Sequence, residues 1–270
     1  MDMKEVIQIM ERPNTLRSLE IELKEMGIKN GMTVLVHSSL SKLGWVSGGS
    51  QAVIQALMNV LTEEGTLVMP SQSADLSDPS EWENPPVPES WWPIIREEMP
   101  AFDAEKTPTR QMGTIAEAFR TYPDVKRSSH PTCSFAAWGK NRDEIIGQHE
   151  LAYGLGEGSP LKKLNDLDAH VLFLGTSYET NTSFHLGEYR APGAKIEKEG
   201  SPIIENGKRA WKVYEEIEMK EDLFEEVGKA FEKDHPVKQG KMGLADSKLF
   251  KVRDAVDFSE KWFTKHRQEN

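Results

Sequence analysis

Cysteine is nearly absent from this sequence, since Cys133 is the only one among 270 residues. A single cysteine cannot form an internal disulfide, and it excludes a zinc or iron–sulfur site made of several cysteines. Cys133 could still act as a nucleophile. A lone cysteine is more often a small buried apolar residue, and we favour that interpretation.

Long apolar runs are also missing. No stretch approaches the ~20 apolar residues that a membrane helix needs, so we expect no membrane span. The N-terminal stretch 1–18, MDMKEVIQIMERPNTLRS, carries charges throughout and lacks the apolar core of a signal peptide. These features predict a cytoplasmic protein.

Basic side chains are fewer than acidic ones, 33 against 44, which gives a formal net charge of −11. This balance argues against a nucleic-acid partner, because phosphate binding needs clustered Lys and Arg. It is compatible with a small cationic substrate, which a negative cleft would concentrate. The more common reason for an acidic surface is solubility alone.

Apolar patterning predicts an α/β fold. A helix is expected over 16–26, and two β-rich runs, 33–37 and 66–69, flank a second helix over 51–61. Both runs are too apolar for half-exposed strands, so we expect strands that are buried on both faces and parallel. A similar run follows at 171–174. We therefore predict a single domain over 1–270, with a central mixed sheet flanked by helices.

Residues 71–111 differ from the rest of the chain. Seven prolines there exclude regular sheet or a long helix over most of the segment. Disorder is one interpretation, but Trp82, Trp91 and Trp92 argue against it because each buries a large apolar area. Long ordered loops in compact domains are usually functional. We expect an ordered excursion near the active site.

The segment 176–190, TSYETNTSFHLGEYR, contains the clearest chemical signal. It follows the 171–174 run, and His185 and Glu188 stand three residues apart in it. In a helix that spacing puts both side chains on one face. A carboxylate that fixes one imidazole nitrogen leaves the other free to take a proton. The pair predicts a general base.

Other uses of the histidines are disfavoured. No HExxH or similar spacing occurs, so we expect no metal. The GxSxG elbow of serine hydrolases is missing as well. We expect His130, which precedes a proline, to shape a turn. The remaining histidines in polar surroundings are expected at the surface: His149, His170, His235 and His266.

Two segments could hold an anionic ligand. His37, Ser38, Ser39 and Leu40 follow a buried strand, where α/β sheets commonly bind ligands; alternatively, the serines only cap a helix. The second segment, 107–114, combines hydroxyls with an arginine and a glycine before an expected helix. By itself it is a weak signal. Neither a Walker loop nor GxGxxG is present.

Taken together, the segments resemble the aminoglycoside 3-N-acetyltransferase family. The resemblance runs from about residue 14 to 195 and more loosely to the C-terminus. It rests on these stretches: VHSSLSKLGWVSGG, GTLVMPSQS, DLSDPSEW with NPPVPESWWP, FDAEKTPTRQMGTIAEAFR, RSSHPTCSFAAWG, GEGSPLKKL and LFLGTSYETNTSFHLGEYRA. It implies an antibiotic N-acetyltransferase-like fold and dependence on coenzyme A.

The resemblance also implies roles. In a T-x-x-H-x-x-E pattern formed by Thr182, His185 and Glu188, the histidine would be the catalytic base. The acceptor would be the 3-amino group of the deoxystreptamine ring of an aminoglycoside. Gly187 stands where many members have alanine. Acetyl-coenzyme A would bind along two sets of residues: His37, Ser38, Ser39 and Leu40, and Thr107, Thr109, Arg110, Met112, Gly113 and Thr114.

Asp75, Asp78 and Glu179 are candidates to attract the polycationic sugar, although loop solubility and helix caps explain them equally well. Two other functions remain open. One is a coenzyme A-dependent acyltransferase on another small amine, and the other is a coenzyme A-binding or ligand-binding protein without catalysis. The sequence is compatible with a homo-oligomer but does not indicate one.

Overall fold

The computed structural model describes residues 3–269, and within them the central sheet has seven strands in the order β3-β4-β2-β1-β5-β9-β8. The three central strands are parallel: β1 (Thr33–Ser38), β2 (Thr66–Pro70) and β5 (His170–Leu174). The outer strands run antiparallel to their neighbours: β3 (Lys126–Arg127), β4 (Phe135–Gly139), β8 (Lys238–Met242) and β9 (Ala245–Lys251). The predicted α/β class with a mixed central sheet is confirmed.

The central strands separate two apolar cores. Val34 and Val36 of β1 face one core, and Leu35 between them faces the other. Both faces of each strand therefore need apolar side chains, which explains why the sequence shows unbroken apolar runs instead of an alternating pattern.

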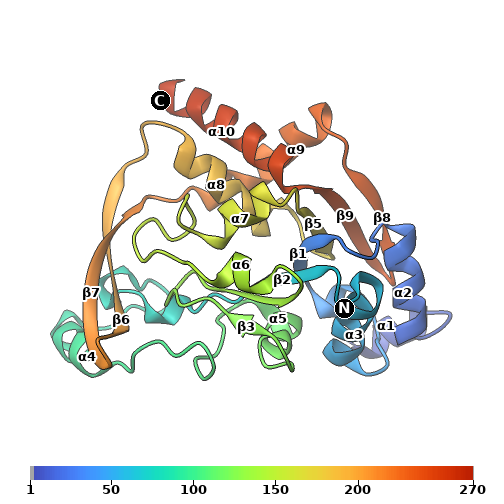
Figure 1. Cartoon of the computed structure of the whole chain (residues 1–270), viewed down its shortest axis with the longest axis horizontal. Coiled ribbons are helices and arrows are strands. Elements are labelled where there is room, and N and C mark those ends of the chain that lie inside the picture. The colour runs from blue at the N-terminus through green and yellow to red at the C-terminus, as the bar shows by residue number, and fades with distance from the viewer. Residues whose placement is uncertain (1–2, 270) are drawn as a thin grey trace.

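Helices cover both faces of this sheet (Figure 1). The first core is closed by α2 (Leu16–Glu25), α3 (Gly49–Leu61) and α5 (Gly113–Phe119). The second is closed by α6 (Arg142–Ile146), α7 (Pro160–Asp166), α8 (Ser183–Arg190), α9 (Phe224–Asp234) and α10 (Val252–Glu269). Among residues 3–269 the structure has no helix that is both long and apolar enough to cross a membrane.

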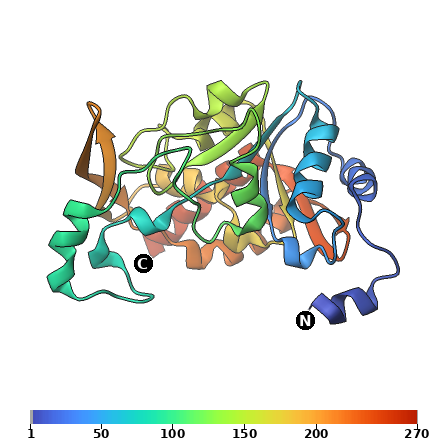
Figure 2. The same ribbon diagram turned by 90° about the horizontal axis from the view of Figure 1, so that it is seen from below.

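A second, two-stranded sheet stands beside the main one. It is the hairpin of β6 (Ile196–Glu205) and β7 (Lys208–Ile217), which pair over their whole length. Figure 2 shows the hairpin at one end of the molecule, next to α4 (Trp92–Glu98), and α1 (Met3–Ile9) at the opposite end.

The proline-rich excursion 71–111 is ordered into short turns and α4. The turns are η2 (Ala74–Leu76), η3 (Pro79–Glu81) and η4 (Glu89–Trp91). Arg127 on β3 fastens the excursion to the sheet, because its guanidinium donates to the carbonyl oxygens of Ser71 and Thr107 and to the hydroxyl of Ser73. The guanidinium also lies over the ring of Phe102, 4.8 Å from its centroid.

Arg127 is only 8% exposed. Burial lowers the pKa of Arg127 to about 10, so the side chain remains charged at neutral pH. A buried cation needs hydrogen-bond acceptors around it, and the excursion supplies most of them. Folding of residues 71–73 and 107 is therefore coupled to this one side chain.

We predict that Arg127→Lys destabilises the protein by about 2 kcal/mol or more, because an ammonium group cannot reproduce the guanidinium fork and leaves buried carbonyls without donors. Chemical denaturation followed by circular dichroism measures the loss. Lys126→Gln on the same strand is the control. It breaks an exposed pair with Asp143 and should cost less than about 1 kcal/mol. Equal stability of the two variants would contradict this account.

Candidate active site

His185 and Glu188 form a buried pair on α8. The helix places the two side chains on one face, with His185 Nδ1 3.1 Å from Glu188 Oε2. Their exposed fractions are 3% and 0%. α8 follows β5 after the turn η5 (Tyr178–Thr180), so the pair stands near the carboxyl end of a central parallel strand. Ligands bind at such ends in α/β sheets.

Partners from two other parts of the chain hold the Glu188 carboxylate. The backbone N–H of Lys220 donates to its Oε1 over 2.8 Å. Arg267 of α10 approaches the same oxygen at 3.5 Å and donates to the backbone carbonyl of Glu188 over 2.9 Å. These contacts compensate a buried negative charge, and they fix the oxygen that orients the imidazole.

The other imidazole nitrogen faces a second carboxylate. His185 Nε2 lies 3.2 Å from Oε1 of Glu221, which begins the turn η6 (Glu221–Leu223). Burial opposes the imidazolium, but the hydrogen bonds to Glu188 and Glu221 outweigh it and raise the pKa of His185 to about 9. In this arrangement the imidazole is protonated at neutral pH.

Glu221 belongs to the wall of an acidic cleft with a volume of about 460 Å³. The hairpin supplies much of that wall, because Glu197 and Glu199 alternate along β6 and share one face of it, and Glu216 pairs in register with Glu197. Asp222 lies beside Glu221. Burial, followed by repulsion from neighbouring carboxylates, raises the pKa of Glu199 to about 7. Such crowding of like charges suits a cationic ligand.

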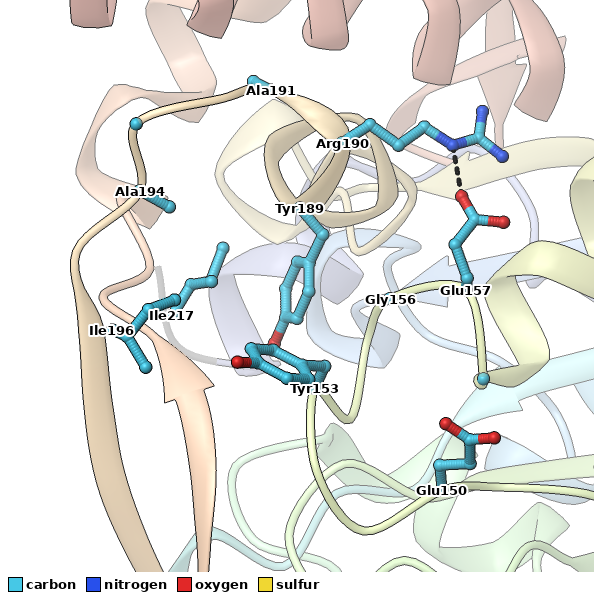
Figure 3. A pocket seen from close by; sticks show the side chains of 12 residues that line it. Glu150, Tyr153, Gly156, Glu157, Tyr189, Arg190, Ala191, Ala194, Ile196 and Ile217 are labelled. Carbon is cyan, nitrogen blue, oxygen red and sulfur yellow. Dashed lines mark hydrogen bonds and ion pairs between the residues drawn. The ribbon is translucent and has the colours of Figure 1, made fainter.

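Tyr189 ties this acidic wall to the helix that carries His185. Its hydroxyl donates to Glu216 Oε1 at the root of the hairpin. Figure 3 shows Tyr189 and Tyr153 together in a neighbouring cavity of about 420 Å³, which is also lined by the ion pair of Arg190 and Glu157. The Tyr153 hydroxyl donates to Glu215 over 2.9 Å. Tyr189 thus ties the hairpin to α8, and Tyr153 ties it to the loop before α7.

The two segments predicted for the anionic ligand lie side by side. A Cβ on Gly113 would come within 3.5 Å of the backbone oxygen of Ser38, and the Ser50 hydroxyl donates to Thr114 over 3.3 Å. Burial lowers the pKa of His37 to about 3, so its ring is neutral. Leu40 and Met112 each pack against the first core.

Several predicted ligand residues in 107–114 already serve the local structure. The Thr107 hydroxyl accepts a hydrogen bond from the backbone N–H of Asp103. The backbone and hydroxyl of Thr109 both donate to Glu117 on α5, at 2.8 and 2.7 Å. Arg110 pairs with Asp75 at 3.1 Å. Of this segment, Gly113 lies next to the strand end at Ser38.

The three predicted substrate acids lie outside the lining of the acidic cleft. Asp75 pairs with Arg110, and Glu179 is exposed on η5. Asp78 makes a two-pronged ion pair with Arg96 on α4, at 2.6 and 2.9 Å. Its charge is one of those that raise the pKa of Glu199. The acids that line the cleft come instead from the hairpin and η6.

Comparison with known proteins settles the family. The family model described as aminoglycoside 3-N-acetyltransferase matches residues 35–264. The chain belongs to the aminoglycoside 3-N-acetyltransferase family. The predicted membership and the predicted acetyltransferase class are thereby confirmed.

Relatives agree over nearly the whole chain. The SPbeta prophage-derived aminoglycoside N(3')-acetyltransferase-like protein YokD of Bacillus subtilis (strain 168) is 57% identical and covers 99% of both chains. Aminoglycoside N(3)-acetyltransferase III of Pseudomonas aeruginosa is 31% identical over 93% of each.

Solved structures of acetyltransferases show the same fold. The structure described as AAC-IIIb binary with CoASH superposes with a TM-score of 0.84 at 29% identity, over 94% of this chain and 98% of that one. AAC-VIa bound to sisomicin gives a TM-score of 0.85 at 26% identity, over 94% and 99%.

Other histidines and Cys133 serve the structure. The Nδ1 of His130 accepts hydrogen bonds from the backbone N–H groups of Thr132 and Cys133, which agrees with the predicted turn. The surface position expected for His149 is wrong, because its ring is half-buried between the Ser128 hydroxyl and the Gly154 carbonyl. Cys133 is buried, and burial raises the pKa of its thiol to about 12. The described residues contain no group of three or more acids, histidines and cysteines placed to bind a metal.

Gly187 allows α8 to approach α10. A Cβ at this position would lie 2.1 Å from the Ser259 hydroxyl and 2.5 Å from the backbone oxygen of Val256. The Ser259 hydroxyl in turn donates to the Phe184 carbonyl over 3.2 Å. The close helix contact also brings Arg267 to Glu188.

We predict that Gly187→Ala lowers the free energy of unfolding by about 1–3 kcal/mol, because the overpacking outweighs the better helix propensity of alanine. Thermal and urea denaturation measure the change. The double variant Gly187→Ala/Ser259→Ala removes one clash and leaves the backbone clash, so it should recover only part of the loss. A single variant as stable as the wild type would show that α8 and α10 do not require this glycine.

Proposed function

We propose that this protein transfers an acetyl group from acetyl-coenzyme A to the 3-amino group of a 2-deoxystreptamine aminoglycoside, with His185 as the general base. One observation carries the proposal: Glu188 fixes Nδ1 of a buried imidazole whose Nε2 points to a carboxylate of the acidic cleft. Once Nε2 is unprotonated and free of that carboxylate, an imidazole held by Glu188 next to a site for cations can remove a proton from a protonated amine.

The charge of the cleft supports an aminoglycoside as acceptor. These antibiotics carry several ammonium groups, and the cleft offers carboxylates at Glu197, Glu199, Glu216, Glu221 and Asp222. AAC-VIa of the same family is described as bound to sisomicin. Electrostatic complementarity of this kind raises the local concentration of a polycation and orients it.

The paired segments 37–40 and 107–114 support coenzyme A as the second substrate. The structure of AAC-IIIb, which has a similar fold, is a binary complex with CoASH. A Cβ on Gly113 would already be in van der Waals contact with the backbone oxygen of Ser38, at 3.5 Å. The two segments therefore lie close enough for one ligand to contact both.

In the proposed reaction, Glu188 holds the imidazole so that Nε2 takes the proton that the acceptor ammonium loses. The freed amine nitrogen then forms its bond to the acetyl carbon as the carbon–sulfur bond breaks. The proton that the nitrogen loses on becoming an amide goes to the departing thiolate, which leaves as the thiol. Acetyl-coenzyme A supplies only the activated acetyl group. Glu188 stabilises the imidazolium that results, and its own charge is balanced by Arg267 and the Lys220 N–H.

We predict that His185→Ala reduces the turnover number for acetyl transfer by about 10²–10⁴-fold and leaves the dissociation constant of coenzyme A within about twofold. Thiol release measures the first quantity, and calorimetric titration the second. His170→Asn is the control, since His170 lies at the opposite end of β5. Near-wild-type turnover by His185→Ala would eliminate His185 as the base.

Glu199 provides a test of the acceptor side. Glu199→Gln removes one carboxylate from the cleft wall, so we predict that the KM for an aminoglycoside rises about tenfold at pH 8, where the wild-type side chain is charged. Glu205→Gln at the tip of the same strand, which pairs with Lys212, should leave it unchanged. A panel of simpler amines tests whether another small amine is the better acceptor.

A further inference from the structure

Glu221 covers Nε2 of His185, the nitrogen that accepts the proton in the proposed reaction. His185 is 3% exposed, whereas the Glu221 side chain in front of it is 64% exposed. The carboxylate therefore stands between Nε2 and the solvent of the cleft. No acceptor amine can reach Nε2 within hydrogen-bond distance until Glu221 has moved.

In the free enzyme, Nε2 of His185 also carries a proton, which a general base must lack. Nε2 donates to Glu221 in this arrangement, and the two carboxylates raise the pKa of His185 to about 9. A protonated imidazole cannot accept a further proton. Glu221 thus blocks the general base both by position and by charge.

We propose that Glu221 is a positioning residue. Its carboxylate covers Nε2 of His185 in the free enzyme and moves to pair with the ammonium group of the incoming acceptor. The inference rests on the proposed function of His185. In this movement the Glu221 carboxylate leaves the His185 imidazolium and pairs with the ammonium group of the acceptor. The Glu221 side chain is exposed enough to rotate between the two. With Glu221 on the ammonium group, His185 keeps only Glu188 and loses its proton more readily.

The other groups around the imidazole are fixed and cannot replace Glu221 in this role. Glu188 lies on α8 and is wholly buried. Glu216 on β7 is held by Tyr189 and by the backbone N–H groups of Gly154 and Ile217. Arg267 on α10 faces Glu188, and Phe224 on α9 packs its ring 4.7 Å from the imidazole. Glu221 is the exposed member of this set.

The test is an NMR titration of the His185 ring in the free enzyme, assigned with His185→Gln. We expect a midpoint near pH 9 for the wild type and a midpoint about 1 to 3 pH units lower for Glu221→Gln. Asp222→Asn removes the same charge from the neighbouring residue and is expected to leave the midpoint in place. Glu221→Asp, which keeps the charge on a shorter side chain, should fall between wild type and Glu221→Gln.

The pH profile of kcat/KM for an aminoglycoside gives the second readout. Because only neutral His185 accepts a proton, activity is lost as the pH falls through the midpoint of the free enzyme. Removing Glu221 lowers this midpoint, so the acid limb of the Glu221→Gln profile should move to lower pH by the same interval as the NMR titration, while KM rises.

The outcomes separate the two proposals. The role of Glu221 is overturned if the His185 midpoint of Glu221→Gln equals that of the wild type. It is also overturned if Asp222→Asn lowers the His185 midpoint equally. Both conclusions hold even when acetyl transfer is normal. If His185→Ala keeps near-wild-type turnover, the proposed function of His185 fails whatever the titration shows. A shifted NMR midpoint without a shifted kcat/KM profile would also overturn the inference.

Discussion

The site depends on one buried carboxylate. Glu188 is wholly enclosed, and a buried charge costs several kcal/mol unless partners compensate it. Those partners come from three places: His185 on α8 itself, the backbone of Lys220 in the connector after the hairpin, and Arg267 on α10. The connector and α10 must therefore be packed before the imidazole has a defined orientation. The close approach at Gly187 is part of the same arrangement.

The hairpin β6–β7 gives the site its charge. Its inner face presents alternate acids, and Tyr189 connects that face to α8 through Glu216. The distance between the base and the acidic wall is thus set by a hydrogen bond from the helix that carries the base. Through this contact the acidic wall on the hairpin, which is outside the main sheet, lies next to the His185–Glu188 pair near the end of β5. The family shares the fold over most of the chain.

Much of the fold could be predicted from the sequence, because strands buried on both faces leave unbroken apolar runs, as at 33–37 and 171–174. The spacing of His185 and Glu188 likewise follows from helix geometry alone. β6 and β8 were not predictable in this way, since their sequences, IEKEGSPIIE and KQGKM, are polar and partly exposed. The acidic wall could not be predicted, because part of it lies on β6 and because the acids of 215–222 resemble an ordinary solvated surface in the sequence. Asp78 stays a predicted substrate-binding residue, and its ion pair with Arg96 could not be predicted from the sequence because the two residues are 18 positions apart in the proline-rich segment.

The most direct test of the central claim is transfer itself. Wild-type protein is mixed with acetyl-coenzyme A and gentamicin, thiol release is followed, and the product is identified by mass spectrometry and NMR. The account predicts thiol release that depends on both substrates, and a single acetyl group on the 3-amino nitrogen. Binding of coenzyme A without any acetylated product, across a panel of aminoglycosides, would contradict it.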